Sequence, residues 1–144
     1  MGEEFAKITG LLEGTGYPAD TLILRDFDNL WSQRFQPHAD GLSYEGQLLA
    51  WYRALAAAGV QTDVAALPAD LSDEAFAYKL IIAPLLNLTT TAMEQNLRGW
   101  VESGGTLVLT FRSGTRTWEN AMRAEAIPGP FAGMAGIEVV ETDA

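Results

Sequence analysis

The sequence predicts an α/β domain in which helices cover both faces of a mostly parallel sheet of about five strands. Short β-rich runs alternate along the chain with longer amphipathic segments, as in consecutive βαβ units. A length of 144 residues, of which 48% are hydrophobic, is enough for one self-sufficient core. Glycine and proline are scattered rather than clustered, which argues against disordered and fibrous classes.

The chain begins with a segment that we expect to stand apart from this domain. Apolar residues recur at helical spacing within residues 3–13 and predict a helix. Gly14, Gly16 and Pro18 then interrupt the pattern, as expected of a linker. We therefore divide the chain into a leading helix and linker at 1–16 and an α/β domain at 17–144.

The helices of the domain are predicted from their ends. A helix is expected over 43–58, because Ser43 is a good N-cap and Gly59 follows the last turn. Thr89 or Thr90 can cap a second helix. The expected strands lie at 21–25, 61–67, 79–83, 106–111 and 137–141, and a short helical turn is expected near 131–134.

Long loops are predicted after the first and fourth strands, at residues 26–42 and 112–130. Most connections in α/β domains are shorter, and long loops in compact domains are usually functional or interfacial. In a flavodoxin-like or Rossmann-like sheet both loops emerge at the carboxyl ends of the strands, where ligands bind. We therefore look for function at this edge.

Charge and cysteine content exclude several classes of partner. The chain has 19 acidic and 9 basic residues, a net charge of -10, which repels nucleic acids and anionic membranes. Cysteine is absent, which removes disulfides, thiolate metal sites and cysteine nucleophiles. No secretion signal or membrane-spanning run is recognisable, so we expect a cytoplasmic location.

Asp26 and Asp28 follow the first predicted strand and suggest a magnesium site for phosphate chemistry. Such a site needs a third acid, a lysine and a hydroxyl at later strand ends, and the third and fourth predicted strands end without an acid or a lysine. We expect instead that Asp26 pairs with Arg112 or Arg116, while Asp28 and Asn29 cap a turn.

Other enzyme classes lack their key residues. The loop at 26–34 has no glycine for binding a phosphate, and no nucleophile follows the third predicted strand. His38 is the one histidine, so we interpret it as a loop or interface residue rather than a base or metal ligand. We predict no cofactor. Aromatic residues in the loops, Trp31, Phe35 and Trp118, favour a partner surface, sugar stacking or packing on the domain's own core.

Several colinear motifs resemble one family from residue 17 to residue 142. The matching residues are Asp26, Asn29, Trp31, Gln36-Pro37, Tyr44, Tyr52-Arg53-Ala54-Leu55, Lys79-Leu80, Gly104-Gly105-Thr106-Leu107-Val108 and Arg112-Ser113-Gly114. With these motifs the chain resembles the middle, trimerisation domain of glycoside hydrolase family 42 β-galactosidases. Residues 1–16 resemble the exit from the catalytic barrel of that family. Asp28 and Trp118 depart from the family pattern.

The resemblance implies a fold like that of class I glutamine amidotransferases, without the nucleophile, and a role in assembly. In that family two glutamates on a preceding barrel cleave terminal β-D-galactosides with retention, and the whole enzyme is a homotrimer. Such a barrel takes about 250 residues, so we expect this chain by itself not to be an enzyme. The expected partner is the catalytic barrel of the same or a neighbouring subunit.

The resemblance also indicates where contacts to a barrel would lie. The interface candidates are Asn29, Trp31, Phe35, Arg112 and Trp118. One alternative function is a galactoside-binding module in which the loop tryptophans stack on the sugar. A second alternative is a magnesium-dependent phosphatase at Asp26 and Asp28.

Overall fold

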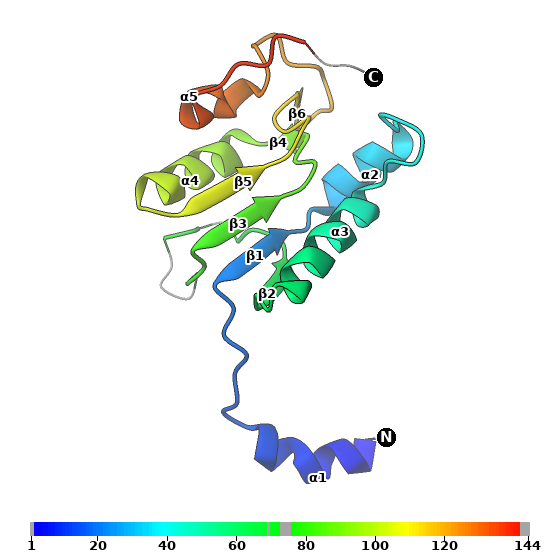
Figure 1. The fold of residues 1–144 in the computed structure, drawn as a ribbon, viewed down its shortest axis with the longest axis vertical. Helices are drawn as coiled ribbons and strands as arrows, with labels where there is room; N and C mark the ends of the chain where they lie inside the picture. Colours follow the sequence, from blue (N-terminus) through cyan, green and yellow to red (C-terminus); the bar gives the residue numbers. More distant parts are fainter. Residues whose placement is uncertain (1, 69, 73–75, 142–144) are drawn as a thin grey trace.

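A parallel sheet lies at the centre of the computed structural model, which describes residues 2–68, 70–72 and 76–141 (Figure 1). Its strands are β1 (Thr21–Leu24), β2 (Thr62–Ala65), β3 (Leu80–Ala83) and β5 (Thr106–Leu109). They lie in the order β2-β1-β3-β5, and every neighbouring pair is parallel. The predicted α/β class and parallel sheet are therefore confirmed.

The central strands are buried on both faces. Leu22, Ile23 and Ile81 are 0% exposed, which explains why β1 and β3 are continuous apolar runs rather than alternating ones. The connection from β1 to β2 and that from β3 to β5 run in opposite directions across the sheet. Because parallel crossovers are right-handed, their helices, α3 (Tyr44–Ala57) and α4 (Thr91–Glu102), cover opposite faces.

Both helix caps agree with the sequence. The Ser43 hydroxyl accepts a hydrogen bond from the Gly46 amide at 3.0 Å, and that of Thr90 accepts one from the Met93 amide at 3.1 Å. Gly59 follows α3 with a φ of 75°, a conformation that favours glycine. The predicted turn near 131–134 is formed by η1 (Gly129–Phe131) and α5 (Ala132–Ala135).

The predicted fifth strand, at 137–141, is wrong, and the main sheet has four strands. In the described structure this segment forms one antiparallel bridge, between Ile127 and Val139, and the Ile137 amide donates to the Ala132 carbonyl. Gly136 turns the backbone at a φ of 66° after α5 and leads it toward Ile127 rather than along β5. The outer edge of β5 therefore has no strand partner among the described residues.

The first predicted loop contains a helix, α2 (Phe27–Phe35), so the prediction of a loop over 26–42 is wrong. Its aromatic residues point outward and only Leu30 among its apolar residues is buried, so α2 lacks the apolar face that usually identifies a helix packed on a core. The second predicted loop contributes β6 (Arg116–Thr117), which pairs in parallel with β4 (Leu88–Thr89) in a small second sheet. Strands of two residues are too short to show the alternation of apolar and polar residues by which a strand is predicted from sequence.

Helix α1 (Gly2–Leu12) stands apart from the sheet at the end of an extended segment (Figure 1). Leu11 and Leu12 are 77% and 56% exposed. The division of the chain at residue 16 stays a prediction. None of the described helices is long and apolar enough to cross a membrane.

Candidate functional site

The carboxyl end of β1 is joined to α2 by a network around Asn29. Asp26 caps α2 by accepting hydrogen bonds on Oδ1 from the Asn29 amide at 2.7 Å and from Asn29 Nδ2 at 2.9 Å. Asn29 also donates to the Leu88 carbonyl at 3.0 Å and accepts from the Leu88 amide at 2.8 Å. Its side chain thus binds α2 to β4.

Three predictions about these residues are wrong. Asn29 is 0% exposed, so its side chain cannot form part of a surface that meets a partner. Among the described residues, Asp26 forms no ion pair with Arg112 or Arg116. Its carboxylate instead accepts a hydrogen bond from Asn29, in the first turn of the same helix. This local contact costs less conformational entropy than an ion pair that requires a long loop to be ordered. The predicted cap at Asp28 and Asn29 is formed by Asp26 instead.

Tyr44 completes the entry into α2. Its hydroxyl accepts a hydrogen bond from the Asp26 amide at 2.8 Å, and the residue is 2% exposed. Burial raises the pKa of Tyr44 to about 12. It packs with Leu30 and Leu85 in a second, smaller core between α2, α3 and the end of β3.

The outer face of α2 carries a row of exposed aromatic side chains. Phe27, Trp31 and Phe35 are 50%, 59% and 88% exposed, and their spacing of four residues places them on one face of the helix. The rings of Phe27 and Trp31 lie 6.0 Å apart, and the Arg25 guanidinium lies 4.5 Å from the centre of the Phe27 ring. We call Phe27, Trp31 and Phe35 the aromatic row.

The loop that carries Trp118 lies beside α2. The Ser32 hydroxyl donates to Asn120 Oδ1 at 3.1 Å, which ties this loop to the helix. Trp118 is 41% exposed. The predicted candidates Trp31, Phe35 and Trp118 are therefore accessible, whereas Arg112 is only partly exposed. Phe27 is not among the predicted candidates, although its position four residues before Trp31 is a signal that could have found it.

In the described part of the chain, Arg112 contacts His38 rather than a carboxylate. Arg112 Nη1 lies 3.0 Å from His38 Nδ1, and His38 Nε2 lies 3.5 Å from Asn87 Nδ2. Burial and the charges of Arg112 and Arg116 lower the pKa of His38. The histidine is therefore neutral near pH 7. It lies between Arg112, which follows β5, and Asn87, which follows β3, at the carboxyl edge of the sheet.

The loop arginine that forms an ion pair is Arg123, which the sequence analysis does not single out. Its guanidinium pairs with Glu94, in the first turn of α4, and both side chains are largely buried. Arg123 also donates to the Thr89 hydroxyl at 2.9 Å. The only sequence signal for this pair is Glu94 in the first turn of a helix, where the helix dipole favours an acid. This signal does not indicate which basic residue pairs with it.

The described residues contain no group of three or more His, Asp or Glu side chains placed to hold a metal ion. Asp26 is used as a cap, and the chain beyond β3 contributes Leu85, whose amide donates to the Thr110 hydroxyl at 2.8 Å. The described residues therefore do not form the cluster of metal ligands that the magnesium phosphatase alternative requires.

Comparison with known proteins identifies the family of the chain. Residues 19–144 match the family described as the β-galactosidase trimerisation domain. The chain is 34% identical over 137 residues to the β-galactosidase Bga of Halorubrum lacusprofundi, covering 95% of this chain and 19% of that protein. It is 36% identical over 124 residues to the β-galactosidase BgaA of Clostridium cellulovorans, covering 86% of this chain and 18% of the relative.

Solved structures give the same result. The polyextremophilic β-galactosidase of the Antarctic haloarchaeon Halorubrum lacusprofundi superposes with a TM-score of 0.77 at 33% identity, covering 92% of this chain and 19% of that chain. The chain thus spans about a fifth of the length of the relatives it matches. It belongs to the family of β-galactosidase trimerisation domains, a noncatalytic part of family 42 glycoside hydrolases.

Proposed function

We propose that this chain acts as an assembly domain of a family 42 β-galactosidase and that the aromatic row is its contact surface. The row carries the proposal because its side chains are exposed: α2 turns Asn29 and Gln33 inward and its aromatic side chains outward. Aromatic residues are enriched at protein interfaces, where a few of them supply most of the binding energy.

The exposure of the aromatic row also argues for a partner. Phe35 is 88% exposed, and Trp118 lies on a neighbouring loop that Ser32 holds against α2. An apolar surface rimmed by polar groups usually marks an interaction site in a soluble protein. A stable interface of about 1,200 Å² or more would place Trp31 near its centre and Phe27 and Phe35 on either side.

The activity of the whole protein follows from its relatives and is part of this proposal. Proteins that share this domain are β-galactosidases, so we infer that the complete protein hydrolyses terminal β-D-galactosides on a separate catalytic barrel. We infer a homotrimer in which the aromatic row meets the barrel of the same or a neighbouring subunit. The exposed leucines of α1 fit contact with the subunit's own barrel. The expected cytoplasmic location stays a prediction.

The test uses the complete protein with the double variant Trp31→Ser and Phe35→Ser. We expect light scattering after size exclusion to show a smaller oligomer, together with reduced hydrolysis of a nitrophenyl β-galactoside. Tyr17→Ser is the matched control, because it removes an aromatic residue that is 70% exposed on the linker rather than on α2. A double variant that keeps the wild-type mass and activity would refute the assignment of this surface.

A second measurement addresses the galactoside-binding alternative. Calorimetric titration of the 144-residue chain with galactose and lactose should show no binding if the tryptophans serve a protein contact. Saturable heat that Trp31→Ala abolishes would favour sugar stacking instead. Family membership supports the assembly function and adds no support to either alternative.

A further inference from the structure

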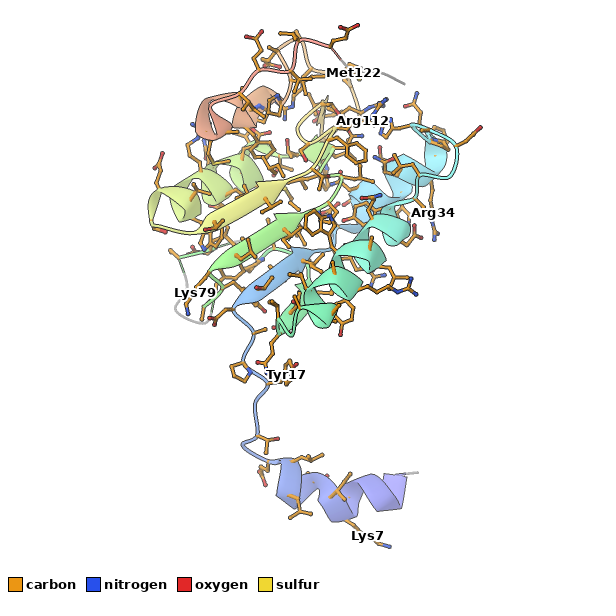
Figure 2. All side chains as sticks on the ribbon, in the orientation of Figure 1. Lys7, Tyr17, Arg34, Lys79, Arg112 and Met122 are labelled. Atoms are coloured by element: carbon orange, nitrogen blue, oxygen red, sulfur yellow. The ribbon has the colours of Figure 1, made fainter. Side chains whose placement is uncertain are left out.

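A cavity of about 430 Å³ opens beyond the carboxyl end of β5. Its polar wall contains His38, Arg112, Arg116 and Glu141, and its apolar wall includes Phe111 and Val139. Figure 2 shows Arg112 at this end of the sheet, with Met122, another wall residue, above it. A volume of this size is within the range of small-molecule sites, which is about 300 to 1,000 Å³.

The cavity has an excess of positive charge in a strongly acidic protein. The net charge of the chain is -10, yet two arginines line this one cavity. The ion pairs of the described residues use Arg34, Lys79 and Arg123, and none of them uses Arg112 or Arg116. Among the described residues of the wall Glu141 is the acidic one, so within this lining the two guanidiniums exceed the one carboxylate by one positive charge.

Among the described residues, the hydrogen bonds of the Arg112 and Arg116 guanidiniums use only Nη1, so other donors remain for a ligand. Arg112 Nη1 lies 3.0 Å from His38 Nδ1, and the neighbouring charges and burial keep that histidine neutral by lowering its pKa. Arg116 Nη1 donates to Asn120 Oδ1 at 2.9 Å and to the Asn120 carbonyl at 3.3 Å. Arg116 Nε is buried and has no hydrogen-bond partner in the described part of the chain. Because this atom is buried, a ligand in the cavity would bind other nitrogens of Arg116 rather than Nε.

The position of the cavity is also that of a ligand site. Residues from two loops meet there: His38 follows α2, and Arg112, Thr115 and Arg116 follow β5. Both loops lie beyond carboxyl ends of parallel strands, where open α/β sheets bind their ligands. Arg112 adopts a φ of 62°, which a residue with a side chain rarely adopts, so the backbone holds this guanidinium at some conformational expense.

We propose that this cavity binds a small organic carboxylate with an apolar body. The planar guanidinium matches a carboxylate in shape and charge, and a monoanion balances the single excess positive charge. The apolar wall would cover the body of such a ligand. This site is separate from the aromatic row and does not depend on the assembly function.

The test is a titration of the 144-residue chain followed by backbone amide NMR at constant ionic strength. Sodium benzoate is the probe, and benzyl alcohol, galactose and inorganic phosphate are titrated in parallel. We expect benzoate to produce saturable shifts at the amides of His38 and of residues 111–116, with benzyl alcohol and galactose producing none there. Binding of benzoate should weaken about tenfold or more in Arg112→Gln and in Arg116→Gln, since each removes a charged donor.

The matched control is Arg53→Gln, which removes the same charge from an exposed position on α3. Its affinity for benzoate should stay within about twofold of the wild type. The proposal is overturned if benzoate does not saturate these amides, if benzyl alcohol binds equally well, or if phosphate binds and benzoate does not. It is also overturned if both folded arginine variants keep the wild-type affinity. If either variant fails to fold, the comparison of benzoate with benzyl alcohol on the wild type decides.

Discussion

Helices α2 and α4 begin alike and orient their side chains in opposite ways. Each is capped by the side-chain oxygen of the preceding residue, Asp26 or Thr90. Helix α4 then buries Leu97 and Trp100, which are 0% and 8% exposed, in the main core. Helix α2 exposes its aromatic row, and its inner face carries polar groups, among which Gln33 Nε2 has no hydrogen-bond partner in the described structure.

The difference separates two uses of a helix in one small domain. The apolar face of α4 stabilises the fold by burial, at about 25 cal/mol for each Å² removed from water. The inner face of α2 is held by the hydrogen bonds of Asn29 and by Leu30 in the smaller core, so its aromatic residues remain available for a partner. Substitutions on the two helices should therefore differ in whether they affect stability or assembly.

The largest effect is expected from Trp100→Ala. The change leaves a cavity beneath α4 and should lower the free energy of unfolding by about 3 to 5 kcal/mol, measured with guanidinium chloride. The Trp100 ring also packs on Gly105 at the start of β5, so the loss should reach the sheet. A loss below about 1 kcal/mol would mean that α4 is not anchored as described.

Asn29→Ala should have the next largest effect, because it tests the inner face of α2. The substitution leaves the amide and the carbonyl of Leu88 without side-chain partners, and we expect a loss of about 2 to 4 kcal/mol in the same assay. Gln36→Ala, an exposed change at the end of α2, should stay within about 0.5 kcal/mol. Equal effects of the two variants would contradict the role of Asn29.

Alkaline pH should weaken the entry into α2 through Tyr44. Its folded pKa is raised from 10.0 to about 12, so the unfolded chain loses the phenolic proton first as the pH rises. The associated stability is present below pH 10 and is lost between about pH 10 and 12, by roughly 2 to 3 kcal/mol. Urea unfolding across this range should show a steeper decline in the wild type than in Tyr44→Phe. Parallel curves would contradict the shift.

The smallest effect on stability is expected from Trp31→Ala. The side chain is 59% exposed and should contribute less than about 0.5 kcal/mol to the unfolding of the isolated chain. In the complete protein the same substitution should weaken assembly, which sedimentation velocity would detect. A large loss of stability in the isolated chain would show that the aromatic row belongs to the fold.

The main elements of the domain are predictable because local signals agree with the tertiary structure. Three strands of the main sheet, β1, β3 and β5, are short and mainly apolar, and α3 and α4 have clear caps at Ser43 and Thr90. Helix α2 is missed because its aromatic residues point outward and its buried face is mostly polar, with Leu30 as its one buried apolar side chain. The segment at 137–141 has the composition of a strand, but the turn at Gly136 directs it away from the edge of β5.

The candidate site is predictable in part. Trp31, Phe35 and Trp118 are accessible, as an interface requires, and their role stays a prediction. Asn29 matches the family motif but is buried, since a motif does not say whether a residue serves contact or folding. The pairing of Arg123 with Glu94 depends on distant elements meeting in space, which no spacing in the sequence indicates.

The open edge of β5 affects how this chain behaves in concentrated solution. Backbone groups along Thr106–Leu109 have no strand partner on their outer side in the described structure, and such an edge is a template on which another extended chain can pair. The net charge of -10 keeps copies apart at low ionic strength. At about 1 M salt the range of this repulsion falls to about 3 Å, so colloidal stability should then depend on whether the edge is covered.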